Sequence, residues 1–125
     1  MRRPERLAEV LREEIMEIVG YELEDPRLWS CTVTEVRVSE NLRDAKVFVL
    51  IEGSEAHINE AMKSLQHAAT FVKQQVSLNL NLRHAPLLHF VRDTVEENAA
   101  RIEKLLGEVN PGENLEERMK DEDNG

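Results

Sequence analysis

The stretch that decides the fold is CTVTEVRVSENLRDAKVFVLIE, residues 31–52. Both of its halves are rich in valine and other β-branched residues, which favour extended backbone. Between them, residues 40–44 combine asparagine, aspartate and other polar residues in a way that is typical of a turn. The pattern therefore predicts two strands, 31–39 and 45–52, that pair as a hairpin.

The apolar positions of the first strand change phase along its length. Val33 lies at an odd position, whereas Val36 and Val38 lie at even positions. Because successive side chains of a strand point to opposite faces, such a change requires an extra residue. We therefore expect a β-bulge near Thr34 and Glu35.

Apolar residues at helical spacing predict one helix before the hairpin and a long one after it. The first begins at Pro4, which suits a first helical turn, and ends before Gly20. The long helix follows Ser54, a good N-cap residue, and its apolar pattern has faded by residues 79–82.

The rest of the chain predicts a third strand and a last helix. Pro86 forbids continuation of the long helix, and residues 87–91 form an apolar run that indicates a strand. Thr94-x-x-Glu97 is a capping-box pattern, which opens a helix that Gly107 closes. The order helix, strand, strand, long helix, strand, helix indicates an α+β domain.

Charge is distributed unevenly along the chain of 125 residues. The formal net charge of −9 by itself argues against a polyanionic partner. Residues 107–125 carry −5 of this charge and few apolar side chains, so we expect a disordered acidic tail after a domain formed by residues 1–106. Residues 61–92 contain no carboxylate and carry +4, which indicates either a locally basic surface or buried elements with little room for carboxylates.

Motifs for catalysis and for tightly held ligands are missing. The sequence has no phosphate-binding glycine loop, no paired-histidine zinc helix and no nucleophile elbow. The single cysteine, Cys31, can form neither an internal disulfide nor a zinc site alone, and it indicates a reducing compartment. We therefore expect a cytoplasmic protein that is not an enzyme, with no cofactor, no metal, no small-molecule substrate and no membrane contact.

A polar stripe on the long helix is the feature that suggests a function. Its members follow one another at spacings of 3, 4, 3 and 4, which places them on one face: Lys63, Gln66, Thr70, Lys73 and Ser77. The stripe contains cations and no carboxylate, and side chains of these types suit phosphate and sugar oxygens. An ordinary solvated helix face is the alternative, but such faces usually include glutamate or aspartate.

Four segments of the chain together resemble one known family. They are DPR at residues 25–27, TVTEVRVS at 32–39, NLRDAKVFV at 41–49 and LRHAPLLHF at 82–90. In this order and at this spacing they resemble bacterial ribosome-binding factor A, and the resemblance extends from about Arg6 to Leu106.

The resemblance implies a type-II KH-like fold of order α-β-β-α-kink-α-β, in which helices cover one face of a three-stranded sheet, followed by a C-terminal helix. In that family a kink between two helices replaces the Gly-x-x-Gly loop of KH domains, and its usual sequence is Ala-x-Gly. The corresponding residues here are Ala68, Ala69 and Thr70. Thr70 departs from the glycine, which implies a shallower kink or one capped by the threonine hydroxyl.

The resemblance also implies a function. The family acts as a non-enzymatic assembly and maturation factor for the small (30S) ribosomal subunit, binds 16S rRNA, assists processing of its 5′ end and supports growth in the cold. The implied partners are the 30S subunit and 16S rRNA, and we expect a monomer. The candidate RNA-binding residues are Lys63, Gln66, Thr70, Lys73 and Arg83, with the N-terminal Arg2, Arg3 and Arg6 as further candidates.

Two other classes of function remain open from the sequence. A protein-interaction adapter could use Phe48 and Leu50 on the exposed sheet face, or the N-terminal helix. A small enzyme would require a cleft that gathers His84, His89 and Asp93.

Overall fold

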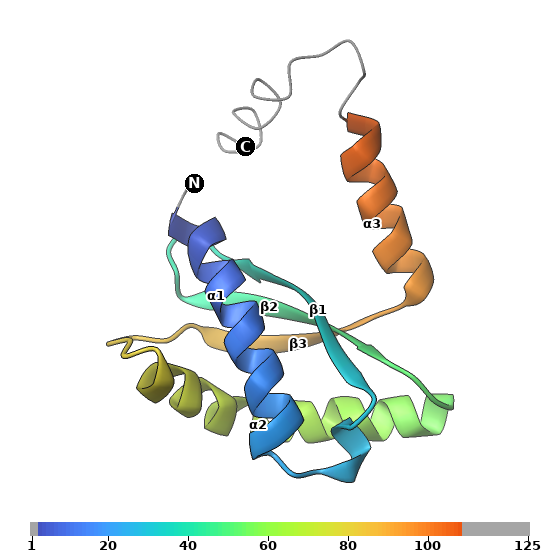
Figure 1. The fold of residues 1–125 in the computed structure, drawn as a ribbon, viewed down its shortest axis with the longest axis horizontal. Helices are drawn as coiled ribbons and strands as arrows, with labels where there is room; N and C mark the ends of the chain where they lie inside the picture. Colours follow the sequence, from blue (N-terminus) through green and yellow to red (C-terminus); the bar gives the residue numbers. More distant parts are fainter. Residues whose placement is uncertain (1–2, 109–125) are drawn as a thin grey trace.

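In the computed structural model, which describes residues 3–108, helices pack around a three-stranded sheet (Figure 1). The predicted α+β class and order of elements are confirmed. The expected tail lies outside the described residues from position 109 onward, and the last helix includes Gly107 rather than ending before it. The elements are α1 (Arg3–Glu17), a π-helical turn η1 (Ile18–Glu22), a 3-10 turn η2 (Pro26–Leu28), β1 (Cys31–Val38), β2 (Asp44–Ile51), α2 (Glu55–Asn79), β3 (Leu87–Asp93) and α3 (Val95–Glu108).

The predicted hairpin and bulge are both present in the sheet. The strands follow the order β1-β2-β3, with β1 antiparallel and β3 parallel to the central β2. Val33 pairs with Val49 and Glu35 pairs with Phe48, so that Thr34 is the extra residue of the bulge. Its hydroxyl oxygen lies 3.2 Å from the Phe48 carbonyl, beside the disrupted part of the ladder.

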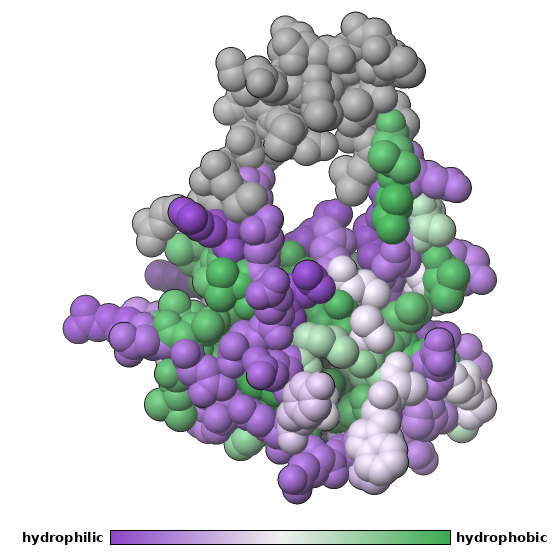
Figure 2. All heavy atoms as spheres, viewed as in Figure 1, coloured by the Kyte–Doolittle hydropathy of each residue, from purple (hydrophilic) through white to green (hydrophobic). Residues whose placement is uncertain are grey.

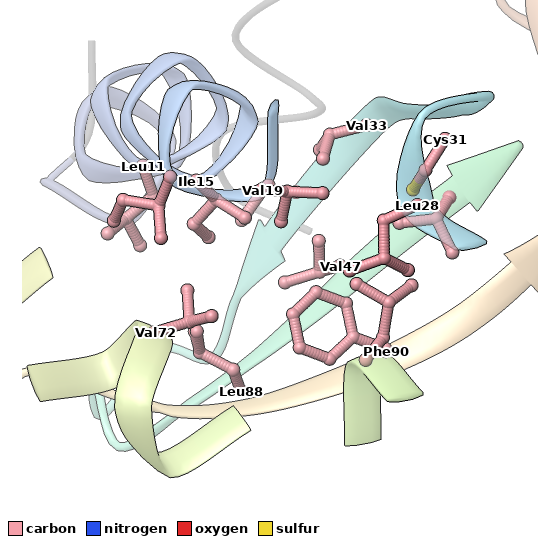
Figure 3. Packing of buried hydrophobic residues seen from close by; sticks show 14 of the residues in the cluster. Leu11, Ile15, Val19, Leu28, Cys31, Val33, Val47, Val72, Leu88 and Phe90 are labelled. Atoms are coloured by element: carbon pink, nitrogen blue, oxygen red, sulfur yellow. The ribbon is translucent and has the colours of Figure 1, made fainter. Parts of the chain in front are cut away.

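The core lies between one face of the sheet and the helices α1 and α2. Alternate residues of β2 (Ala45, Val47, Val49 and Ile51) point to this face and are at most 5% exposed. On this same face, Leu11 and Ile15 of α1 and Val72 of α2 join the β2 residues in a single apolar cluster (Figure 3). The prediction that helices cover one face of the sheet is therefore confirmed.

The opposite, outer face of the sheet carries α3 through a buried ion pair. Asp93, at the end of β3, is 1% exposed and accepts hydrogen bonds from the guanidinium of Arg101 at 3.0 and 2.7 Å. The Thr34 hydroxyl donates a further bond to Asp93 at 2.8 Å. Arg101 also lies 3.0 Å from Glu35 and 4.8 Å above the ring of Phe48, which favours a cation–π contact. Polar contacts of Arg101 thus hold α3 to the sheet, and α3 otherwise projects away from it (Figure 1).

The α-helix α1 ends at Glu17, before Gly20 as predicted, but the helical path does not stop there, which the sequence did not predict. The backbone continues through η1, where the Leu23 N–H donates to the Ile18 carbonyl at 3.1 Å. Ile18 and Val19 are both buried, and the wider π turn lets these adjacent residues reach the core. The left-handed residue that follows the helix is Glu24, with φ of 50°.

Replacing Arg101 with methionine should destabilise the fold by about 3 kcal/mol at pH 7, because the buried Asp93 carboxylate would lose its charged partner. The hydrogen bonds from Arg101 lower the pKa of Asp93 from 3.8 to about 2, against the effect of burial. A depressed pKa stabilises the folded state above the unfolded value and ceases to do so as the pH falls. The difference in unfolding free energy between wild type and variant, measured by urea titration, should therefore shrink between pH 4 and pH 2.

The matched control is Arg92→Met. Arg92 binds Glu55 at 2.8 Å in a pair whose side chains are 36% and 73% exposed. Exposed pairs of this kind contribute less than about 1 kcal/mol. Equal losses in the two variants would show that the Asp93 cluster does not anchor α3.

Candidate RNA-binding surface

Helix α2 carries most of the candidate surface, and its two faces differ in character. The Ser54 hydroxyl accepts a hydrogen bond from the His57 N–H at 3.1 Å, so the predicted N-cap is confirmed. The buried side of the helix consists of Ile58, Ala61, Leu65, Val72 and Val76. These residues fix the rotation of α2 against the sheet and direct the polar stripe to the opposite side.

Most of the polar stripe is accessible to a partner. Lys63, Gln66 and Thr70 are exposed, and Lys73 is half-buried. Ser77 has a different role, because its hydroxyl donates to the Leu82 carbonyl at 2.7 Å. The Leu82 N–H in turn donates to the Ser77 carbonyl at 2.9 Å, which closes the end of α2. Ser77 therefore positions the loop after the helix, and it also lines the hollow that contains Lys73 and Arg83.

The candidate kink residues lie within an unbroken α-helix. Ala68, Ala69 and Thr70 are all helical, and α2 runs without interruption from Glu55 to Asn79. The two alanines are half-buried against the core, whereas Thr70 is exposed. Among the described residues the Thr70 hydroxyl forms no hydrogen bond, so it does not cap a break. The two halves of α2 nevertheless run at an angle to one another in Figure 1.

The end of α2 and the following loop form a basic corner. Lys73 and Arg83 line a shallow hollow of about 420 Å³ together with His84. Arg6 of α1 lines a second hollow, of about 490 Å³, in which His84 again takes part. His84 therefore joins the two hollows, a role that the sequence analysis missed although it directly follows Arg83.

The other candidates are more widely spread. Lys63 lies ten residues before Lys73 on the same helix, which corresponds to about 15 Å at the rise of an α-helix. Arg3 is the first residue of α1, and Arg2 lies outside the described residues. The structure thus brings Lys73, Arg83 and Arg6 to one corner and leaves Lys63 farther along the face.

Pairing with carboxylates divides the described arginines and lysines into two groups. Four arginines bind a carboxylate at 2.7 to 3.0 Å: Arg27, Arg37, Arg92 and Arg101. Lys63, Lys73 and Arg83 form no ion pair with any residue in the range 3–108. Their charge is therefore free to attract an anion.

Part of the +4 charge of residues 61–92 is neutralised from elsewhere in the chain. Glu55 accepts two hydrogen bonds from Arg92, which raises the pKa of Arg92 and lowers that of Glu55. His89 lies 2.9 Å from the carboxylate of Asp44. Within residues 61–92, the uncompensated positive charge thus lies on α2 and the loop after it.

The cleft required by an enzyme does not form. His89 contacts Asp44, Asp93 is buried beneath α3, and His84 lies in the basic corner. Within residues 3–108, no group of three or more histidine, cysteine, aspartate or glutamate residues could hold a metal ion. In the same part of the chain, no helix combines the length and the apolar character needed to cross a bilayer.

Three single residues bear on the functions considered from the sequence. Cys31 is buried, and burial raises the pKa of its thiol to about 11. Phe48 and Leu50 are half-buried rather than exposed, and Arg101 covers the ring of Phe48. The outer sheet face is therefore less accessible than the adapter hypothesis requires.

The fold is that of a KH-like α+β domain, with a hairpin, a parallel third strand and two helices on one face of the sheet. The sequence has no Gly-x-x-Gly loop, and the helix α2 carries unpaired cations. The family model for ribosome-binding factor A matches residues 3–106, and the chain belongs to this family. The expectation that the chain is not an enzyme agrees with membership in a family of ribosome-binding factors.

Similar proteins support this assignment over most of the chain. Ribosome-binding factor A of Thermomicrobium roseum is 43% identical over 120 residues, covering 96% of this chain and 89% of the relative. The Desulforamulus reducens protein of the same name is 37% identical over 111 residues, covering 89% and 92%. The crystal structure of ribosome-binding factor A from Thermus thermophilus matches with a TM-score of 0.65 at 26% identity, over 73% of this chain and 97% of that one.

A second structural match comes from a ribosomal complex. It is a homology model of Thermus thermophilus ribosome-binding factor A, fitted into a cryo-EM map of a complex of that protein with the 30S subunit. The TM-score is 0.58 at 27% identity, and the match covers 67% of this chain and 88% of that one. The fold described above is thus similar to that of a protein whose model was fitted into a map of a 30S complex.

Substitutions at Thr70 should follow helix propensity, because this residue is exposed in the middle of α2. We expect Thr70→Ala to stabilise the protein by about 0.5 kcal/mol and Thr70→Gly to destabilise it by a similar or smaller amount. Urea unfolding of the three proteins would measure the order. If the glycine variant were the most stable, position 70 would not be helical in solution.

Proposed function

We propose that this protein binds the 30S ribosomal subunit through 16S rRNA and acts as an assembly and maturation factor. The observation that carries the proposal is the set of unpaired cations, Lys63, Lys73 and Arg83, on α2 and the loop after it, in a segment (residues 61–92) that contains no carboxylate. Relatives named ribosome-binding factor A, one of them fitted into a map of a 30S complex, support the choice of partner.

Recognition on this surface would depend on the shape of the RNA rather than on its sequence. Lysine, arginine, glutamine and threonine side chains suit phosphate and sugar oxygens, which carry no sequence information directly. The net charge of −9 opposes binding to free RNA. A monomer with this distribution of charge would bind only where a folded rRNA site offers several contacts at once.

The mechanism would be a population shift. A protein that binds one rRNA conformation more tightly than another stabilises it by the difference in binding free energy. No step would require a bond to be made or broken by the protein. Holding one conformation in the cytoplasm would assist processing of the 5′ end of 16S rRNA by separate nucleases, and it would matter most in the cold, when misfolded RNA rearranges slowly.

The double variant Lys73→Glu/Arg83→Glu should bind immature 30S particles at least tenfold more weakly, an estimate of about 1.4 kcal/mol for two lost phosphate contacts. Each substitution replaces an attraction to phosphate with a repulsion. Sucrose-gradient co-sedimentation with immature and mature 30S particles at two salt concentrations measures the loss. Unchanged co-sedimentation would show that another surface makes the contact.

A comparison of Arg83→Gln with Arg92→Gln isolates the contribution of an unpaired charge. Both arginines lie in the segment without carboxylates, but Arg92 is already bound to Glu55. Arg83→Gln should make the negative slope of log K against log salt shallower by about 1, because one phosphate contact is lost. Arg92→Gln should leave this slope unchanged. Equal changes in slope would contradict the distinction between the paired and unpaired groups.

A further inference from the structure

Two of the few aromatic side chains are exposed in one short segment. The chain has one tyrosine, one tryptophan and three phenylalanines. Tyr21 is 80% exposed and Trp29 is 77% exposed, and both lie in the connection between α1 and β1. This connection lies at the end of the molecule opposite α3, where near-white side chains of intermediate hydropathy gather in Figure 2. Exposed tyrosine and tryptophan are enriched where proteins bind other proteins.

The backbone around Tyr21 is held in place by buried neighbours. Ile18 and Val19 of η1 belong to the core, and the Leu23 N–H closes the turn on the Ile18 carbonyl. Tyr21 therefore projects from an ordered turn. An anchor that is already ordered loses less conformational entropy when a partner binds.

The segment before Trp29 is held in a similar way. Leu28 is 2% exposed, and Asp25 caps η2 by accepting a hydrogen bond from the Arg27 N–H at 3.0 Å. Asp25 also accepts a hydrogen bond from the Ser64 hydroxyl of α2 at 2.6 Å. The Arg27 side chain and this hydroxyl hold the pKa of Asp25 well below its ordinary range, so the cap stays charged.

A hollow beside Tyr21 combines apolar and acidic groups. Glu13, Met16, Glu17, Gly20 and Tyr21 line a space of about 440 Å³, and we name this set the Tyr21 surface. A Cβ atom at Gly20 would meet nothing within 4 Å, so the space over this position is open. The hollow is wide enough for a long side chain from a partner.

The carboxylates of the Tyr21 surface are not neutralised. Glu13 and Glu17 are exposed, and neither has a hydrogen bond or an ion pair with any residue in the described part of the chain. Glu14, on the same helix, differs because it accepts a hydrogen bond from the Asn79 amide at 2.7 Å. Two unpaired carboxylates beside an exposed ring attract a cation and repel a phosphate backbone.

We propose that the Tyr21 surface, with Trp29 on the same connection, docks an arginine- or lysine-rich segment of a protein partner. A guanidinium or ammonium group over the Tyr21 ring would gain a cation–π contact and pair with Glu13 and Glu17. The aliphatic stem of the same side chain would pack on Met16. This surface is distinct from the unpaired cations of α2, so one protein could contact RNA and a basic protein with different parts of its surface.

The test uses the full chain and a fluorescently labelled, arginine-rich peptide, with binding followed by anisotropy at low salt. Tyr21→Ser should weaken binding about tenfold, and Glu13→Gln/Glu17→Gln should do the same. Because Tyr21 is exposed, its replacement should leave urea unfolding unchanged, which is measured alongside. Amide NMR shifts caused by the peptide should fall in residues 13–29.

The control variant is Glu96→Gln/Glu103→Gln on α3, which removes the same charge from two exposed positions elsewhere. It should bind the peptide within about twofold of wild type. An equal loss of peptide binding in the control, or unchanged binding by Tyr21→Ser, would show that the peptide is attracted only by the overall negative charge of the protein. Either result would overturn the proposal. Shifts in residues 13–29 caused by a single-stranded RNA instead of the peptide would overturn it as well.

Discussion

The central strand β2 is the element on which the rest of the structure depends. It pairs with β1 on one side and β3 on the other, and its alternate residues Ala45, Val47, Val49 and Ile51 form the floor of the core. Helices α1 and α2 can bury their apolar sides only against this floor. Their rotation is therefore fixed, and the side of α2 that carries Lys63 and Lys73 must face solvent.

Features encoded by neighbouring residues could be predicted from the sequence. The bulge at Thr34 follows from a change of phase in one strand, and the caps at Ser54 and Thr94 follow from residues three positions apart. The π-helical turn η1 that follows α1 could not be predicted in this way. Gly20 favours a stop, but burial of Ile18 and Val19 against distant strands carries the helical path past it.

The candidate site was predictable only in part, for the same physical reason. Helical spacing placed Lys63, Gln66, Thr70 and Lys73 on one face, and the structure confirms this placement. Which cations are unpaired depends on contacts between residues far apart in the chain. Arg92 meets Glu55 across 37 positions, and no local pattern shows this. The Asp93–Arg101 cluster includes Thr34, 59 positions away, and was missed for that reason.

The buried pair of Asp93 and Arg101 has a consequence for the surface as a whole. By binding Asp93 and Glu35, Arg101 neutralises two carboxylates on the outer sheet face, of which Asp93 is buried and Glu35 stays partly exposed. Unpaired carboxylates such as Glu13 and Glu17 remain at the far end of α1, while unpaired cations remain on α2 and its loop. Because interactions between exposed charges fade beyond about 10 Å at 0.1 M salt, a partner senses the nearest patch rather than the net charge of −9. An acidic protein can therefore present a cationic site, provided that its carboxylates are paired, buried or held elsewhere.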